Sequence, residues 1–425
     1  MLKRIPISFL FAFLFAFTLS ACGKFKPDTS ADGFKARAQT QAQGDLHVTA
    51  AALGGKESHE YFGEKLAKKG VQPVWLKIQN DSKKPYWLFP ISVDPDYFSP
   101  AEAAYRSTRW KSKTEKQLMI HFFDTQQIPF YIPTGKTVEG FLYTNRDIGS
   151  KEVSVDLVGH QDLKRMNFVL PVPGLTTDYQ MVDFDTLYRP DEIRSVGLVE
   201  LRRALEEMPC CTNDKRGKKE GQGDAVNLVF IGHLEDMITT FVRRGWKETA
   251  AGSKGSSMSM VKHLFFGGAY ENAPMSKLWL FGRSQDISFQ KPRPTIRQRN
   301  HLRLWMTNLR YEEKPVWVGT ISRDIGLRPT MHAAFFITHK IDSDIDEARD
   351  YVLQDMMYSE SIGLFGFVKG VGAAPYDDPH YNLTGDTWYT DGMRAVVIVA
   401  KYPTPILKTK NLNWEATTNQ YNLFK

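Results

Sequence analysis

Residues 226–245 read VNLVFIGHLEDMITTFVRRG and carry the clearest local pattern in the chain. The apolar run 226–231 predicts a short strand that ends at Gly232. Arginines in the last turn of the following segment, with Gly245 just beyond it, are typical of a helix C-terminus. Apolar residues at helical spacing predict an amphipathic helix between these two points: Leu234, Met237, Ile238, Phe241 and Val242. The stretch therefore predicts a strand followed by a helix.

The residues after this stretch continue with strand-like runs and few helices. A helix is expected at 344–357. Strands are expected at 278–281, 287–290, 301–306, 316–321, 335–341, 364–368 and 393–400. Runs of strands bounded by a few helices favour an α+β domain with a mainly antiparallel sheet over residues 225–402. The remaining residues, 403–425, are polar and are expected to form a C-terminal tail.

The N-terminal half shows short strands and tight turns between residues 45 and 172. Strands are expected at 74–79, 86–93, 130–132, 138–143 and 153–158. One helix interrupts them, because Ser99, Pro100 and Glu102 have the spacing of a helix N-terminus. Closely spaced short strands favour an all-β, sandwich-like domain.

Two further segments connect these parts. Residues 22–44 are rich in Ala, Gln, Lys and Asp and are expected to form a flexible tether. Residues 173–224 are expected to be a linker that contains one short amphipathic helix at 198–208. The sequence thus predicts a multidomain protein, which its length also favours at roughly 100–200 residues per domain.

The first 21 residues have the layout of a bacterial secretory signal. Lys3 and Arg4 give a positive start, an apolar run follows, and small residues precede Cys22. The run is too short for a comfortable membrane-spanning helix, which needs about 20 residues. The stretch LSACG at 19–23 resembles the lipobox of bacterial lipoproteins. This resemblance implies cleavage before Cys22 and lipid attachment to its thiol; the alternative is an ordinary signal peptide that ends near a cysteine.

The resemblance to lipoproteins predicts where in the cell the protein is located. The protein is expected to be lipid-anchored in the bacterial envelope, facing the periplasm or the cell surface. Gly23 stands where an aspartate would resemble an inner-membrane retention signal, which favours the outer membrane.

Charge and cysteine content limit the partners. Without residues 1–21, 53 Lys and Arg face 48 Asp and Glu, a net charge of +5 that is no nucleic-acid signature. Cys210 and Cys211 are the only cysteines after Cys22. A vicinal disulfide or a soft-metal pair stays open, but two ordinary thiols are favoured because adjacent residues bridge with strain and no other cysteine completes a metal site.

The stretch 297–305, RQRNHLRLW, holds the most informative cluster of charge. Leu302 and Leu304 are expected to point to the core. Alternation along a strand places the following residues together on the other face: Arg297, Arg299, His301, Arg303 and Trp305. Such a row suits a phosphate or carboxylate, since Arg forks bind pairs of oxygens. The alternative is the solvated face of an antiparallel sheet.

A second cluster surrounds His339. Together with three nearby acids it has the residue types of a metal site: Asp342, Asp344 and Asp346. The same acids also fit the start of a helix, where Asp344 and Glu347 would form a capping box. The second explanation accounts for most of the cluster, so no metal ligand is assigned.

Asp324 follows a β-run and stands next to Arg323. It is either a catalytic carboxylate or half of an ordinary ion pair, and the ion pair is favoured. If the strand before Asp324 neighbours the strand of Arg303, then His301, Arg303, Asp324 and His339 converge on one surface. That hypothesis fails if the two histidines lie on opposite faces of the sheet.

The second half of the chain also resembles the LssY-like C-terminal domain, a bacterial family. The matching words are, in order, VNLVFIG (226–232), GW (245–246), PMSKLWLFGR (274–283), QDISFQK (285–291), HLRLW (301–305), PVWVG (315–319), THKID (338–342), EARDY (347–351) and TDG (390–392). The family has no settled activity. Some members are fused to membrane domains of the DedA or phosphatidic-acid-phosphatase type. By association, these fusions imply a function in the envelope or on lipid-linked molecules. One departure is Lys340, which stands where a second histidine is expected beside His339.

Two functions remain open at this point. The first is a binding or assembly module whose basic strand meets an acidic envelope lipid, polymer or protein. The alternative is an envelope hydrolase acting on phosphoesters or lipid-linked substrates, with His301 or His339 as acid/base, Arg299 and Arg303 holding the anion, and Asp324 orienting. A hydrolase should bury its histidines against an acid, whereas a binding module should leave the row open. No cofactor motif, nucleophile elbow, P-loop or zinc-protease motif is recognised, and the oligomeric state stays open.

Overall fold

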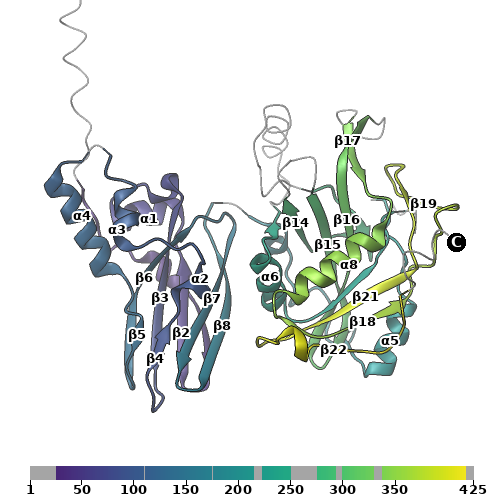
Figure 1. The fold of residues 1–425 in the computed structure, drawn as a ribbon, viewed down its shortest axis with the longest axis horizontal. Coiled ribbons are helices and arrows are strands. Elements are labelled where there is room, and N and C mark those ends of the chain that lie inside the picture. The colour runs from purple at the N-terminus through teal and green to yellow at the C-terminus, as the bar shows by residue number, and fades with distance from the viewer. Residues whose placement is uncertain are drawn as a thin grey trace, which may run out of the picture. The chain divides into compact units, whose positions relative to one another are not determined.

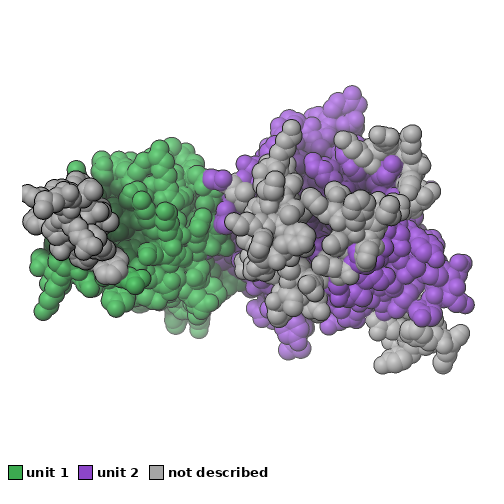
Figure 2. Space-filling model, turned by 90° about the horizontal axis from the view of Figure 1, so that it is seen from above, with its two compact units in different colours: residues 1–147, 155–166, 170–173 green, residues 148–154, 167–169, 174–425 purple. Residues whose placement is uncertain are grey.

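The computed structural model describes residues 25–109, 111–174, 176–214, 223–249, 275–292, 299–329 and 337–417. It divides into two compact units, coloured separately in Figure 2. Unit 1 comprises residues 1–147, 155–166 and 170–173, and unit 2 comprises residues 148–154, 167–169 and 174–425. The expected signal segment, Cys22 and Arg297 lie outside the described residues. No helix in these described ranges is long and apolar enough to cross a membrane.

The N-terminal part is built on two four-stranded antiparallel sheets (Figure 1). The first has the order β1-β2-β3-β6, with β1 Gln39–Gln43, β2 Leu46–Ala52, β3 Val71–Asn80 and β6 Lys136–Asn145. The second has the order β5-β4-β7-β8, with β5 Tyr131–Ile132, β4 Tyr86–Leu88, β7 Ser150–Gly159 and β8 Asp162–Pro171. Strand β5 lies against β3 and β6, so the two sheets meet there. The expected sandwich-like class is confirmed.

Helices add to this sandwich more than the sequence predicted. The expected cap at Ser99 is confirmed, since its Oγ accepts a hydrogen bond from the Glu102 N–H at 3.2 Å. The helices are α1 Gly55–Phe62, α2 Pro90–Val93, α3 Pro100–Tyr105 and α4 Lys113–Gln126, with short 3-10 helices at η2 Gly33–Arg37 and η3 Leu66–Lys69. Phe62 of α1 and Phe123 of α4 join the aromatic core on the first sheet.

The segment before β1 is folded, so the expected tether is wrong for residues 25–44. Phe34 in η2 is 1% exposed, and its ring lies 6.0 Å from Trp75 and 5.8 Å from Phe141. Strand β1 then pairs with β2 along its whole length. A polar average composition hid this element, because one buried aromatic is enough to fix a short segment on a core.

Unit 2 contains a ten-stranded mixed sheet with the order β11-β14-β15-β16-β10-β21-β18-β22, to which β17 and β9 add at β16 and β15. The strands are β9 Arg194–Ser195, β10 Leu228–Ile231, β11 Lys247–Glu248, β14 Ile287–Pro292, β15 Arg299–Tyr311, β16 Lys314–Pro329, β17 Ile337–Ile341, β18 Ile362–Lys369, β21 Met393–Val399 and β22 Lys410–Asn411. Three pairs are parallel (β10 with β21, β15 with β9, β18 with β22) and the other pairs are antiparallel. The predicted α+β class with a mainly antiparallel sheet is confirmed.

Among the described residues of unit 2, three helices and several short elements accompany this sheet. The helices are α5 Leu198–Glu206, α6 Leu234–Arg243 and α8 Ile345–Met357. The remaining elements are η4 Asp178–Met181, η5 Ile406–Lys408, the pair β12 Trp279–Leu280 and β13 Arg283–Ser284, and the pair β19 His380–Tyr381 and β20 Thr387–Trp388. Gly245 has φ +76° just after α6, as its position predicted. Asp344 caps α8 by accepting from the Asp346 and Glu347 N–H groups, each at 3.1 Å.

Both faces of the sheet are covered. Helices α6 and α8 lie on one face (Figure 1), where Phe241 and Val352 join a core that includes Leu302 and Leu304. Helix α5 lies on the other face, where Leu201 and Leu205 join a core with strand residues from β10, β15, β16 and β21. The central strands therefore bury side chains on both sides.

The predicted linker and tail are both parts of this fold. Helix α5 belongs to unit 2 and is fixed by Arg394 of β21, which is fully buried. The Arg394 guanidinium donates at 2.8–2.9 Å to backbone carbonyls at the end of α5 and beyond: Leu205, Met208, Pro209 and Gly370. In the tail, β22 adds to the sheet edge, and Leu412 and Trp414 pack on the same core as α5.

Replacing Arg394 with Met should destabilise unit 2 by roughly 3–5 kcal/mol, because it leaves buried carbonyl groups without donors. Calorimetric unfolding of the full chain would measure the loss. The control is Arg203→Met on the same helix, whose side chain is 79% exposed and which should change stability by less than about 0.5 kcal/mol. Similar effects for the two variants would contradict the role of Arg394 as the hydrogen-bond donor that fixes the end of α5.

Candidate functional site

The strand pattern expected for 299–305 is present in β15. Leu302 and Leu304 point to the face covered by α6 and α8, and Trp305 points to the face covered by α5. Since alternate residues share a face, Arg299, His301 and Arg303 lie on the side of Trp305. On this face, Trp305 and Leu309 belong to the apolar core under α5, whereas the side chains nearer the N-terminal end of β15 are polar.

Neighbouring strands bring further polar residues to the same place. The pairing of β15 with β16 sets Arg299 opposite Asp324. The pairing of β14 with β15 sets Gln290 opposite His301. Directly opposite residues share a face of the sheet, so Asp324 stands on the same side as His301.

Asp324 lies between the two predicted histidines. His301 Nε2 and His339 Nδ1 are each 3.0 Å from Asp324 Oδ2, and the two rings are 6.0 Å apart between centroids. A register shift in the β16–β17 pairing between Asp324 and Gly326 accompanies this approach. The two histidines therefore meet at one carboxylate. Of the four residues expected to converge, His301, Asp324 and His339 come together, and Arg303 lies further along β15, opposite Thr320.

The environment sets the charges in this trio. Burial lowers the pKa of His301 and outweighs the attraction of Asp324, so the neutral imidazole is favoured. Burial alone would raise the pKa of Asp324, but His301 and His339 outweigh it and hold that pKa well below its usual range. The site thus combines an ionised carboxylate, 3% exposed, with a neutral imidazole that is 14% exposed.

The two arginines of the row that the structure describes, Arg299 and Arg303, are buried. Arg299 is 7% exposed and Arg303 is 4% exposed. Arg303 donates through Nε to the Ser276 carbonyl at 3.2 Å and through Nη2 to Ser276 Oγ at 3.1 Å. Burial lowers the pKa of both arginines, and Asp324 opposes that shift. This contradicts the open basic row that a surface-binding strand would present.

Several buried polar atoms around Asp324 have no hydrogen-bond partner among the described residues. Three of these atoms belong to the two close His–Asp contacts, which are 3.0 Å long and do not count as hydrogen bonds. The atoms are His301 Nε2, Asp324 Oδ2, His339 Nδ1, Arg299 Nε and, opposite Arg303, Thr320 Oγ1. Most buried polar groups in folded proteins are satisfied. A concentration of exceptions at one place indicates a site that a ligand or solvent completes.

Other predicted residues have structural partners instead. Arg323 does not pair with Asp324: its Nε donates to Asn300 Oδ1 at 3.3 Å and its Nη1 lies 3.2 Å from Glu347. The acids expected near His339 belong to the helix cap and to a buried ion network. Within the described ranges, no group of three or more His, Cys, Asp or Glu side chains is arranged to hold a metal ion. Cys210 and Cys211 are not joined in a disulfide in the structure.

The buried ion network ties α8 to the start of β21. Arg349 is 1% exposed and its Nη1 and Nη2 donate to Asp391 at 2.7 and 3.2 Å. Asp346 Oδ1 accepts from Arg349 Nη1 at 3.1 Å and from Thr390 Oγ1 at 2.6 Å. These residues hold the scaffold together and do not reach the trio around Asp324.

Two residues of the site were missed from the sequence. Gln290 of β14 accepts a hydrogen bond from Arg299 Nη1 at 2.6 Å, and Thr320 of β16 lies opposite Arg303. The sequence contains a pattern that could have indicated Gln290: Ile287-Ser288-Phe289-Gln290 has a polar residue at every second position, as expected for a strand with one polar face. An alternating strand beside a charged one is a candidate for the same face.

Comparison with known proteins gives one family. The model described as LssY C-terminus matches residues 205–393, which contain β14 to β17 and the whole trio around Asp324. The C-terminal half of the chain is therefore similar to this family, as the ordered words of the sequence indicated. No curated protein matches the chain.

Lowering the pH from neutrality should destabilise unit 2 in two steps. His301 has a folded pKa below its ordinary 6.5, so the unfolded chain takes up the proton first and stability falls as the pH drops below about 6.5. Asp324, with its lowered pKa, contributes stability that is present above about pH 4 and is lost below it. His301→Gln should remove the first step in calorimetric unfolding across this range, and it should also reduce the second step, because His301 helps to hold the Asp324 pKa low.

The control for that measurement is His233→Gln, since His233 is exposed and lies in the same unit. It should leave both steps unchanged. Parallel pH profiles for the parent chain and His301→Gln would show that His301 is not the buried neutral group described here.

Proposed function

We propose that unit 2 hydrolyses phosphoesters at the trio formed by His301, Asp324 and His339. The observation that carries this proposal is the set of unsatisfied buried polar atoms around Asp324. Buried donors and acceptors without protein partners are expected where a substrate or an attacking water supplies them. The two histidines also lie against an acid, and Arg299 and Arg303 are buried and do not form an open row. These features favour the hydrolase over the surface-binding module.

His339 is the proposed general base. Its Nδ1 faces Asp324, which leaves Nε2 free of that contact and able to accept a proton from water. The water oxygen attacks phosphorus, the ester P–O bond breaks, and the imidazolium returns the proton to the departing oxygen. Asp324 stays ionised, orients the ring and stabilises its protonated form. His339 suits this role better than His301, because its side chain is 35% exposed against 14% for His301.

Arg299 is the proposed anion-binding residue. Gln290 holds one end of its guanidinium, and its Nε donor has no partner among the described residues. A fixed guanidinium in a water-poor site stabilises the charge that develops on phosphoryl oxygens. Arg303 is held by Ser276 and contributes positive potential from further along β15.

We propose further that the protein is a lipoprotein of the bacterial envelope, anchored through Cys22 and placed at the outer membrane. The positive start, the apolar run and the small residues before Cys22 support this address. Such an anchor would bring unit 2 to lipid-linked phosphoesters, which is the substrate class that the address favours.

Loss of the base should abolish turnover. His339→Ala and Asp324→Asn should each lower kcat/KM toward a chromogenic aryl phosphate by about 10²–10⁴, the usual contribution of general acid–base groups. The assay uses the purified full chain, with and without added divalent metal ions. His233→Ala is the matched control, since His233 is exposed in the same unit. A parent chain without turnover under all conditions would overturn the proposal.

The lipid anchor has its own test. Growth with an alkyne-bearing fatty acid should label the parent chain and leave Cys22→Ser unlabelled, because the thiol is the proposed attachment point. Cys210→Ser serves as the control for labelling at another cysteine and should remain labelled. Equal labelling of the parent and Cys22→Ser would contradict attachment at Cys22.

A further inference from the structure

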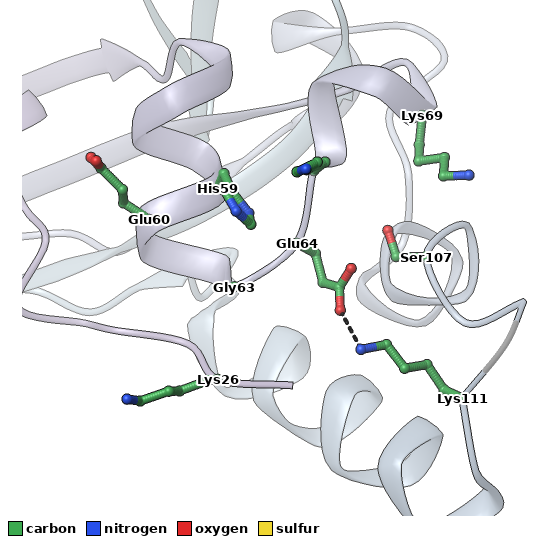
Figure 3. A pocket seen from close by; sticks show the side chains of 9 residues that line it. Lys26, His59, Glu60, Gly63, Glu64, Lys69, Ser107 and Lys111 are labelled. Carbon is green, nitrogen blue, oxygen red and sulfur yellow. Dashed lines mark ion pairs between the residues drawn. The ribbon is translucent and has the colours of Figure 1, made fainter. Parts of the chain in front are cut away.

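Unit 1 carries a basic hollow beside the start of its described chain (Figure 3). Its volume is about 560 Å³. Four lysines and two glutamates are among its lining residues: Lys26, Lys65, Lys69, Lys111, Glu60 and Glu64. Lys65 directly precedes η3 and Lys69 ends it, and Glu60 lies in α1. Glu64 follows shortly after α1, Lys26 lies at the start of the described chain, and Lys111 lies shortly before α4.

Each acid of the hollow lies close to a lysine. Glu64 lies 3.0 Å from Lys111, the pair drawn with a dashed line in Figure 3, and Lys111 also lies 3.2 Å from Glu115. Glu60 lies 3.6 Å from Lys56, which is outside the hollow. The other three lysines are exposed and form no ion pair with the residues that the structure describes: Lys26, Lys65 and Lys69. Four lysines against two glutamates therefore leave the lining of the hollow with an excess of positive charge.

The start of the described chain is seated firmly next to this hollow. The Phe25 N–H donates to Glu115 Oε1 at 2.8 Å, and the Phe25 ring packs on Phe122 with centroids 5.7 Å apart. Gly63, with φ +68°, lets the Lys26 carbonyl approach so closely that a Cβ there would lie 2.7 Å from it. Only residues 23 and 24 separate Phe25 from Cys22, so the Cα atoms of Cys22 and Phe25 are at most about 11 Å apart.

We propose that this hollow binds the phosphate groups of anionic phospholipids in the membrane that holds the lipid on Cys22. This placement rests on the lipid attachment proposed above. Because the chain has no slack after Cys22, the surface around Phe25 must stay near the head groups. Lysines suit that surface, since each is a flexible point charge that an anionic leaflet attracts.

Lysine footprinting of the purified full chain tests this assignment. The chain is reconstituted in vesicles of phosphatidylcholine alone or of phosphatidylcholine with phosphatidylglycerol, and acetylation is followed by mass spectrometry. Phosphatidylglycerol should slow acetylation of Lys65 and Lys69 about fivefold, because a lysine at an anionic surface gains about 1 kcal/mol. Lys83 and Lys136 are internal controls: both are exposed and lie near the opposite end of β3, where Asn80 pairs with Lys136.

Paired variants sharpen the result. In Lys65→Gln/Lys69→Gln, the protection of Lys26 that depends on phosphatidylglycerol should weaken, whereas Lys83→Gln/Lys136→Gln should retain it in full. Equal protection in both vesicle types, or equal protection of all lysines, would overturn the proposal. Protection by inorganic phosphate in detergent would assign the hollow to a free anion and would also overturn it.

The two proposals fail separately. The mass of the N-terminal peptide from the same preparation reports whether Cys22 carries lipid. A lipidated chain without selective protection contradicts the hollow alone. Selective protection in a chain without lipid supports the hollow as an anion-binding surface and contradicts the anchor.

Discussion

Strands β15 and β16 are covered on both faces, and the rest of unit 2 depends on that constraint. A polar side chain on such a strand must find a partner, because an unpaired buried group costs free energy comparable to a lost hydrogen bond. Arg303 meets the requirement with Ser276. The atoms around Asp324 do not meet it within the described residues. Because the sheet is covered on both faces, buried polar atoms that lack a partner are unusual, and those around Asp324 are therefore informative about function.

Sequence patterns predicted the local features well and the long-range ones poorly. The period of two along β15 placed Leu302 in the core, because side-chain alternation is a property of the strand itself. No local pattern could show that the opposite face is covered, since its cover comes from distant segments such as α5 and Ser276. The approach of His339 to Asp324 depends on strand pairing across a register shift, which is also non-local.

Because local patterns do not show contacts with distant segments, the sequence predicts a tether at residues 22–44 and a linker at residues 173–224, where the structure has folded elements. Phe34 and Arg394 each fix a segment to a core that the segment's own composition does not reveal. Lys340, which departs from the pattern expected beside His339, pairs with Asp386 at 3.4 Å and leaves the trio around Asp324 intact. The residues that carry the family resemblance thus divide into a buried scaffold and a separate polar site.

The seating of Phe25 has a consequence for how the protein would search for substrates. A lipoprotein with a long tether explores a deep layer of the periplasm, whereas one with almost no slack is confined to a thin layer at the bilayer. Confinement of this kind raises the effective concentration of membrane-bound ligands without any new contact. Encounters then follow lateral diffusion in two dimensions, so a modest intrinsic affinity for a lipid-borne group would be sufficient.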